Sequence, residues 1–301
     1  MKNLWNKNKI RSYYNPIKFI KLIEEMNPLF KKGNCGDSMS FIIFILDQLH
    51  DELKHIRDSN ASDYYSLQDN YDAKKAFNNF FESFKSQTSI ITDIFFGIDE
   101  SRLICLNCKN NYSKEGKAYP IYYNYTTYNF LIFPLEEVIK YRNNNMNQNK
   151  TVTLEDCFIY NQKMDLMTGE NQNWCNTRKQ LCDTNYIVNI YSSPNVMILI
   201  LNREKNNCSD VKLDFKETID ITYFVSINIS RIIYNLYGVV TQIGSHFVAF
   251  YKSPINNKWY CCDDAIINEV KDFKKEVIDF GKPNILFYKL QKQKINNIYF
   301  K

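Results

Sequence analysis

"LYGVVTQIGSHFVAFYKSPINNKWYCCDDAIINEV" (residues 236–270) carries the most informative pattern in the sequence. Two runs of apolar residues, HFVAFY and KWYCC, are separated by the turn-forming residues SPINN at 253–257. Alternation with a period of two is typical of half-buried β-strands, and a short break rich in Pro and Asn joins such strands as a hairpin. We therefore expect a β-hairpin with His246 at the start of its first strand and Asp263 at the end of its second.

Pairing of these two strands has a chemical consequence. It brings the carboxylate of Asp263 toward the imidazole of His246, where it can fix the tautomer and stabilise the protonated ring. The alternative is a structural histidine, with Asp263 and Asp264 merely ending a strand and opening a turn. The other two histidines, His50 and His55, lie in LDQLHDELKHIRD beside acidic residues, which predicts a solvated helix face.

The first hundred residues have the pattern of helices. Asn15 can cap a helix with Pro16 at its first position, and the Asn-Pro pair at 27–28 should end it. Asp37 can cap a second helix, whose apolar residues recur at i, i+3 and i+4 and spread around it, so we expect burial on most sides. Residues 62–96 continue with the same kind of pattern.

From about residue 97 the pattern changes to strands. Short β-branched and aromatic runs alternate with Asn, Gly and Pro breaks, as in YNFLIFPL, NVMILILN and ILFYKL. The polar stretch YRNNNMNQNK (141–150) is predicted to be an inserted surface loop. Helices followed by strands indicate an α+β fold.

Composition excludes several classes of protein. The 301 residues carry a formal net charge of only +5, with lysines scattered among acids, so we expect no nucleic-acid partner. No apolar run approaches the roughly eighteen residues that span a bilayer, and residues 1–10 lack the apolar core of a secretory signal, so we expect no membrane partner. Nine irregularly spaced cysteines are typical of free thiols or metal ligands, which predicts an intracellular protein, in the cytoplasm or nucleus.

The segment 236–270 resembles the histidine box of the ubiquitin-specific proteases, the papain-like cysteine deubiquitinases. Their pattern runs through a Gly-His-Tyr-x-Ala-Tyr strand to a Trp-Tyr-x-Phe-Asp/Asn-Asp strand. The resemblance implies that His246 is the general base, that Asp263 orients it, and that Asp264 is the adjacent supporting aspartate.

Other segments resemble the same family in the same order along the chain. They are GDSMSFIIFILDQLHDEL, FFGIDESRLICLNCKNN, TVTLEDCFIYNQKMDLMTGENQNWC, SSPNVMILILNRE, FKETIDI and NILFYKL. The resemblance implies a single partial protease domain over residues 1–301, with ubiquitin or a ubiquitinated protein as partner. About residues 12–96 would form a helical thumb, and about 97–301 the β fingers and palm.

Cys35 raises the question of the nucleophile. It stands just ahead of the second helix, and a helix N-terminus lowers the pKa of a thiol. In the family, however, the nucleophile lies in a Gly-Asn-Thr-Cys-Tyr-x-Asn-Ser motif well upstream, and Cys35 falls on a glutamine position of the scaffold helix. Neither that motif nor the family's oxyanion-stabilising residue occurs in these 301 residues, so we expect Cys35 to be a bystander and the N-terminal part of the fold to be incomplete.

The fingers of the family carry a zinc site, which is degenerate here. Cys105-x-x-Cys108 is a good half-site for one tetrahedral zinc. For the second half Cys175 fits, but the next ligand position holds Arg178, leaving Cys182 as the candidate fourth ligand. The resemblance implies no required cofactor and at most a structural zinc; the alternative is a metal-free β ribbon with free thiols.

Two functions stay open on these residues. The first is a deubiquitinase whose cysteine box is encoded upstream of Met1, with residues 1–301 alone inactive. The second is a catalytically dead relative that binds ubiquitin or another protein. Ser245 in place of glycine before the histidine, with Gly244 one place earlier and Gln242 in place of a family histidine, favours the second. Retention of the histidine and both aspartates favours the first.

Overall fold

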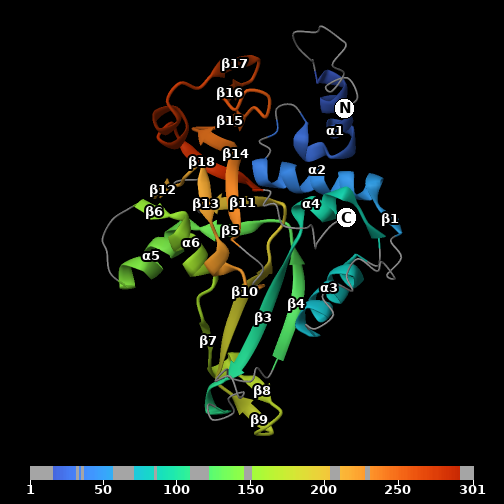
Figure 1. Cartoon of the computed structure of the whole chain (residues 1–301), viewed down its shortest axis with the longest axis vertical. Helices are drawn as coiled ribbons and strands as arrows, with labels where there is room; N and C mark the ends of the chain where they lie inside the picture. The colour runs from blue at the N-terminus through green and yellow to red at the C-terminus, as the bar shows by residue number, and fades with distance from the viewer. Residues whose placement is uncertain are drawn as a thin grey trace. The chain divides into compact units, whose positions relative to one another are not determined.

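The computed structural model describes residues 16–31, 34, 37–56, 71–84, 87–108, 122–145, 151–203, 211–227 and 231–291 (Figure 1). The chain forms two compact units, Met1–Gln48 and Leu49–Lys301. The helices are α1 (Ile17–Met26), α2 (Ser38–Leu53), α3 (Tyr71–Ser83), α4 (Ile90–Phe95), α5 (Leu135–Asn145) and α6 (Leu154–Asn161). Single helical turns are η1 (Pro28–Phe30), η3 (Leu106–Cys108), η4 (Gly169–Asn171), η6 (Thr222–Phe224) and η7 (Lys274–Ile278). None of the helices within these ranges is both long and apolar enough to cross a bilayer.

The strands follow the helical start, as the pattern predicts for an α+β fold. They are β1 (His55–Ile56), β2 (Gln87–Thr88), β3 (Gly97–Cys105), β4 (Tyr122–Tyr128), β5 (Leu131–Pro134), β6 (Thr151–Thr153), β7 (Asp165–Met167), β8 (Asn173–Cys175), β9 (Gln180–Cys182) and β10 (Thr184–Ser192). The rest are β11 (Val196–Asn202), β12 (Lys212–Asp214), β13 (Thr218–Asp220), β14 (Ile233–Ile243), β15 (His246–Lys252), β16 (Trp259–Asp263), β17 (Ile266–Glu269) and β18 (Lys282–Leu290).

In the first unit, capping residues set the helix boundaries. The carboxylate of Asp37 accepts hydrogen bonds from the backbone of Met39 (3.3 Å) and Ser40 (3.0 Å), which confirms it as the cap of α2. Helix α1 ends at Met26, directly before the predicted Asn-Pro stop. It begins at Ile17, with Pro16 in the preceding turn, and Asn15 lies outside the described residues.

Helix α2 is less buried than its composition predicts. Leu46 is its one buried residue in the described structure, and Phe41 and Leu53 are 36% and 47% exposed. The expectation of burial on most sides is therefore wrong. Apolar residues spread around the helix, but the aromatic contacts that Phe30 makes with Phe41 and Phe44 cover only part of its circumference.

His50 also differs from its predicted environment. Its Nδ1 lies 2.8 Å from Oγ of Ser89, and its ring packs edge-on against Phe84. Ser89 is the N-cap of α4 and is fully buried. His50 is thus half-buried against a helix terminus and not on a solvated face, because distant residues form its surroundings. His55 is exposed as predicted, but it lies on strand β1 and not on a helix, because α2 ends at Leu53.

The main sheet has eight strands and carries the hairpin that includes His246. Its order is β17-β16-β15-β14-β18-β11-β5, and β13 pairs with β14. All neighbouring strands are antiparallel except β11 and β5, which are parallel. Helices α5 and α6 pack against one face of this sheet, and the core between them includes the buried side chains of Phe133, Val138, Phe158, Leu199 and Tyr288.

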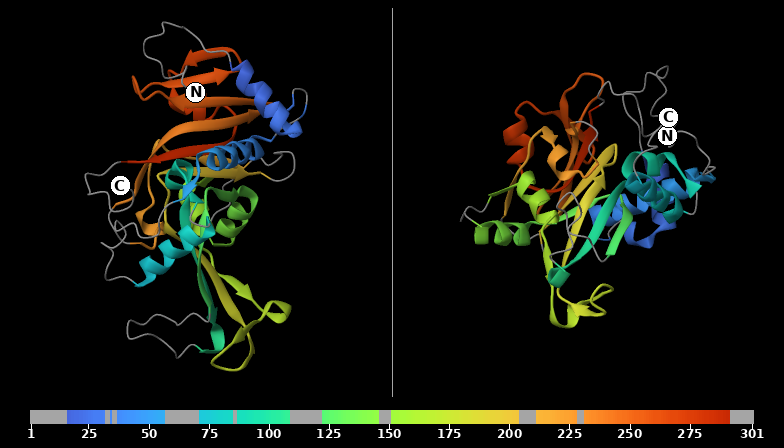
Figure 2. Two further views of the ribbon diagram at one scale, coloured as in Figure 1. Left: turned by 90° about the vertical axis from the view of Figure 1, so that its right-hand side faces the viewer. Right: turned by 60° about the horizontal axis from the view of Figure 1, so that its bottom comes forward.

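A second sheet extends away from the first. Its order is β4-β3-β10-β7, and its long strands β3 and β10 lead to the small β8–β9 hairpin at their far end (Figures 1 and 2). Helix α3 packs against β4, burying Phe77 and Phe80 with Tyr125. The end of β3 and the β8–β9 hairpin carry the cysteines for which a metal site is predicted.

The predicted polar loop at 141–150 is partly helical. Helix α5 continues to Asn145, and residues 146–150 lie outside the described structure. The guanidinium of Arg142 donates to the backbone carbonyl of Thr151 and lies 3.3 Å from the carboxylate of Asp156. These contacts with β6 and α6 stabilise the last turn of a helix that the Asn-rich sequence does not predict.

Candidate active site and thiol cluster

Two tight turns place His246 and Asp263 on one face of the sheet. Strands β14 and β15 join through Gly244 and Ser245, with Ile243 opposite His246. Gly244 has φ +60°, a left-handed conformation that glycine adopts without strain. The turn therefore needs its glycine at position 244, and Ser245 can stand directly before the histidine. The side chain of Gln242 donates to the Gly244 carbonyl at 2.7 Å and closes the turn.

The hairpin of β15 and β16 forms where the sequence predicts it. Ala249 lies opposite Cys262 and Lys252 opposite Trp259, and the turn closes through a 2.9 Å bond from Ser253 N–H to the Lys258 carbonyl. The carboxylate of Glu217 accepts hydrogen bonds from Lys252 Nζ (2.7 Å) and Trp259 Nε1 (3.0 Å). This contact joins the two strands at their turn end and fixes the register on which the other end depends.

At the open end of this hairpin His246 meets Asp263. Nε2 of His246 lies 2.6 Å from Oδ1 of Asp263, and both side chains are about half exposed, at 45% and 49%. Asp264, in a left-handed turn with φ 49°, brings its carboxylate within 4.8 Å of both groups. The hydrogen bond that Asp263 accepts raises the pKa of His246. Desolvation opposes this rise, and the negative charges of Asp263 and Asp264 add to it.

This geometry leaves the other ring nitrogen for chemistry. Because Asp263 occupies Nε2, Nδ1 is the atom through which His246 would exchange a proton with a reacting group. A histidine oriented by a carboxylate in this way is the arrangement of a general base. An imidazole and two carboxylates can also hold a metal ion, but exposed acidic groups commonly lie together without one.

The described cysteines include none that bonds to His246. Burial raises the pKa of Cys261 and of Cys262, which disfavours the thiolate that a nucleophile requires. Cys157 is fully buried in the core, and burial raises the pKa of its thiol strongly. Cys35 and Cys208 lie outside the described residues.

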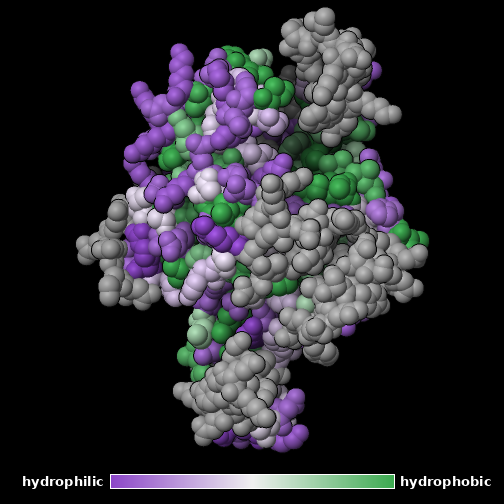
Figure 3. All heavy atoms as spheres, in the orientation of Figure 1, coloured by the Kyte–Doolittle hydropathy of each residue, from purple (hydrophilic) through white to green (hydrophobic). Residues whose placement is uncertain are grey.

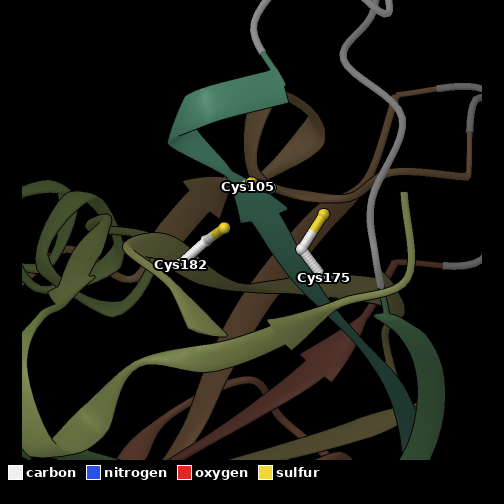
Figure 4. Close-up of side chains that lie close together, drawn as sticks. All are labelled: Cys105, Cys175 and Cys182. Carbon is white, nitrogen blue, oxygen red and sulfur yellow. The ribbon is translucent and has the colours of Figure 1, made fainter. Parts of the chain in front are cut away.

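The four cysteines singled out for a metal site come together. The sulfurs of Cys105, Cys175 and Cys182 all lie within 4.8 Å of one another (Figure 4), and Cys108 Sγ lies 3.5 Å from Cys175 Sγ. Two come from the end of β3 and η3, and two from β8 and β9. Four thiolates around one zinc at 2.3 Å would have their sulfurs about 3.8 Å apart. Three of these sulfurs lie within 4.8 Å of one another and Cys108 joins them through Cys175, so the donor set has the chemistry and the grouping that zinc requires.

Local hydrogen bonds favour a thiolate at one of these positions. Burial opposes charge at Cys175, but bonds from the backbone N–H of Arg178 and Thr177 and from the Cys108 thiol lower its pKa to about 7. Burial, with the bond to Cys175, raises the pKa of Cys108 to about 11. The cluster therefore already contains one thiol prepared to lose its proton, as a metal ligand must.

The contacts of Arg178 could not be predicted from the sequence. Its side chain donates from Nη2 to the carbonyl of Asn107 at 2.6 Å, connecting the β8–β9 turn to the segment between Cys105 and Cys108. The sequence shows only an arginine where a ligand is expected. No local pattern indicates which distant carbonyl it reaches.

The comparison with known proteins agrees with this fold. A sequence profile described as ubiquitin carboxyl-terminal hydrolase matches residues 1–288. Ubiquitin carboxyl-terminal hydrolase 2 of Bos taurus is 24% identical over 293 residues, covering 92% of this chain and 44% of the relative. The Gallus gallus protein of the same name is 25% identical, with 92% of this chain and 74% of the relative covered. Ubiquitin carboxyl-terminal hydrolase 9 of Saccharomyces cerevisiae is 26% identical, with 91% and 34% covered.

Solved structures show the same fold. A SAGA deubiquitinase module of Ubp8, Sgf11, Sus1 and Sgf73 bound to monoubiquitin matches with a TM-score of 0.65 and 19% identity, covering 92% of this chain and 53% of that one. The Ubp8 module bound to ubiquitin aldehyde matches with a TM-score of 0.63 and 18% identity, covering 92% and 54%. The chain thus spans about half of these proteins. With residues 1–288 matched by the family profile, the chain belongs to the ubiquitin carboxyl-terminal hydrolases of the ubiquitin-specific protease type.

Proposed function

We propose that residues 1–301 recognise ubiquitin or a ubiquitinated protein, with His246 as the general base of the lineage's hydrolytic site. The observation that carries this proposal is the 2.6 Å contact between His246 Nε2 and Asp263, held by a hairpin in a family domain. Two structural neighbours are complexes with monoubiquitin and with ubiquitin aldehyde, which supports ubiquitin as the partner.

The chemistry follows from the free ring nitrogen. With a cysteine thiol at Nδ1, His246 would take its proton, and Asp263 would stabilise the resulting imidazolium. The thiolate would attack the carbonyl carbon of ubiquitin's C-terminal glycine, and His246 would return the proton to the leaving amine. Asp264 would add negative charge beside the protonated ring.

Residues 1–301 alone can hydrolyse ubiquitin conjugates only if one of their own cysteines acts as the nucleophile. The described cysteines are buried, disfavoured as thiolates or grouped in the finger cluster, and Cys35 aligns with a scaffold position of the family. We therefore propose that residues 1–301 bind ubiquitin without cleaving it. A Gly-Asn-x-Cys motif encoded in frame upstream of Met1 would supply the missing thiol.

A second function is a binding module that has lost catalysis. The observation that favours it is the altered turn before His246, where Gly244 takes the left-handed position and Ser245 the place of the family glycine. Sequencing of the transcript upstream of Met1 separates the two. An in-frame cysteine box supports the protease, and a stop codon supports the binding module.

We also propose that Cys105, Cys108, Cys175 and Cys182 hold a structural zinc ion. Zinc would cross-link the end of β3 and η3 to the β8–β9 hairpin and would take no part in hydrolysis. The free thiols and the ubiquitin partner are consistent with a protein of the cytoplasm or nucleus.

The experiment is hydrolysis of ubiquitin that carries a fluorogenic C-terminal group, by the wild-type chain, by Cys35→Ala and by the control Cys262→Ala. We expect no release of the fluorophore above buffer for any of the three. Release by the wild type that disappears only in Cys35→Ala would assign Cys35 as the nucleophile and overturn the proposal of an inactive chain.

A further inference from the structure

Arg178 connects the two halves of the thiol cluster. It lies in the turn between β8 and β9, which carry Cys175 and Cys182. Its Nη2 donates to the carbonyl of Asn107 at 2.6 Å, and Asn107 lies in η3, between the other two cysteines. One side chain therefore joins segments that are about seventy residues apart in the sequence.

The same residue contacts sulfur on both sides. Its guanidinium is within hydrogen-bond reach of the Cys108 sulfur, and its backbone N–H donates to the sulfur of Cys175. The turn that presents it is closed by a 2.7 Å bond from the N–H of Lys179 to the carbonyl of Cys175. Lys179 has φ 54°, so the turn bends sharply directly after Arg178.

The negative charge of the ligands explains why a cation is favourable at this position. Four thiolates around one Zn²⁺ leave a net charge of −2 on the cluster. Hydrogen bonds from outside the ligand sphere orient ligands and reduce their charge, and their removal typically lowers metal affinity about 10- to 100-fold. A guanidinium suits this role because it is always protonated and can donate to a carbonyl and a sulfur at once.

We propose that Arg178 is a positioning residue of the metal site: it stands where a fourth cysteine would be expected, holds the β8–β9 turn against η3, and neutralises part of the thiolate charge. The inference rests on the zinc site proposed above. In this arrangement Cys182 supplies the fourth ligand from a position later in the chain. The position where the fourth cysteine would be expected carries the positively charged Arg178.

A neighbouring residue provides a matched control. Lys179 carries the same charge one position away, and the described structure shows no hydrogen bond or ion pair of its Nζ with the cluster. The variant Lys179→Asn removes that charge and keeps a residue that tolerates the left-handed backbone. Any effect specific to Arg178 must then come from its contacts and not from general charge.

The test uses the full 301-residue chain loaded with zinc. Transfer of zinc to a chromogenic chelator is followed by absorbance for the wild type, Arg178→Gln, Arg178→Lys and Lys179→Asn, with bound zinc measured by elemental analysis. We expect Arg178→Gln to release zinc about tenfold faster. Arg178→Lys should fall between, because it keeps the charge but loses the forked geometry, and Lys179→Asn should match the wild type.

A spectroscopic measurement separates positioning from general stability. In the Co²⁺-substituted chain the thiolate-to-cobalt charge-transfer band reports on hydrogen bonds to sulfur. It should shift in Arg178→Gln and stay unchanged in Lys179→Asn. If the wild type and all variants bind zinc, release it at equal rates and give identical spectra, the role of Arg178 is overturned and the zinc site itself stands. A folded wild type that binds no zinc would overturn the metal site and the inference with it.

Discussion

The carboxylate of Asp263 holds Nε2 of His246 at 2.6 Å across the open end of the β15–β16 hairpin. Because both side chains are about half exposed, this orientation depends on strand register more than on burial. The register in turn is fixed at the far end of the hairpin, where Glu217 bonds both Lys252 and Trp259.

The pKa of His246 should depend on Asp263. The hydrogen bond raises the pKa of the imidazole above its ordinary value, so Asp263→Asn should lower it. Asp264→Asn should lower it less, because Asp264 acts through charge alone. Histidine proton shifts followed by NMR against pH give both values. An unchanged His246 pKa in Asp263→Asn would show that the pair does not form in solution.

Zinc content should depend on Cys182 as much as on the regular half-site. Cys182→Ser removes one of the three sulfurs that lie within 4.8 Å of one another and should lower bound zinc from one ion per chain to a small fraction. Cys262→Ser, outside the cluster, should keep the full content. Elemental analysis after gel filtration measures both, and full zinc in Cys182→Ser would remove Cys182 from the ligand set.

Asp99 should make stability depend on pH. Its side chain on β3 is largely buried with no partner for Oδ1 among the described residues, and burial raises its pKa to about 7. The folded state therefore binds a proton that the unfolded state has released between about pH 4 and pH 7, and stability falls as pH rises through this window, by up to about 1.4 kcal/mol per pH unit.

The variant Asp99→Asn should remove this slope, while Asp279→Asn, at an exposed position, should keep it. Urea unfolding at a series of pH values measures the free energy of unfolding. A slope in Asp99→Asn equal to that of the wild type would contradict the assignment of the buried carboxyl.

The cap of α2 should contribute measurably to stability. Asp37→Ala removes acceptors for the backbone N–H groups of Met39 and Ser40 and should cost about 1 kcal/mol in the free energy of unfolding. Asp37→Asn retains a capping oxygen and should cost much less. Urea denaturation of the three chains checks the order, and equal stabilities would show that the cap is not formed.

Local pattern was enough to predict the hairpin and the elements around it. Alternating residues on both sides of 253–257 placed Asp263 near His246, and Asp37 marked the start of a helix. Both features depend on residues close in sequence or on a short turn. The Cys105-x-x-Cys108 spacing was recognisable for the same reason, and its use as a zinc half-site stays a prediction.

Features that depend on distant contacts could not be predicted. His50 is half-buried because Ser89 and Phe84 reach it, and α5 extends to Asn145 because Arg142 contacts β6 and α6. The exposure of apolar residues on an edge strand also could not be predicted from the local pattern. Ile266 and Ile267 are 60% and 61% exposed on the edge strand β17, in a region where hydrophobic and hydrophilic side chains mix on the surface (Figure 3).

The most direct test of the account is titration of fluorescently labelled ubiquitin with the 301-residue chain, followed by anisotropy and by competition with unlabelled ubiquitin. We expect saturable binding with one ubiquitin per chain, reversed by the competitor and unaffected by Cys35→Ala. A folded chain that shows no saturable binding of ubiquitin would contradict it.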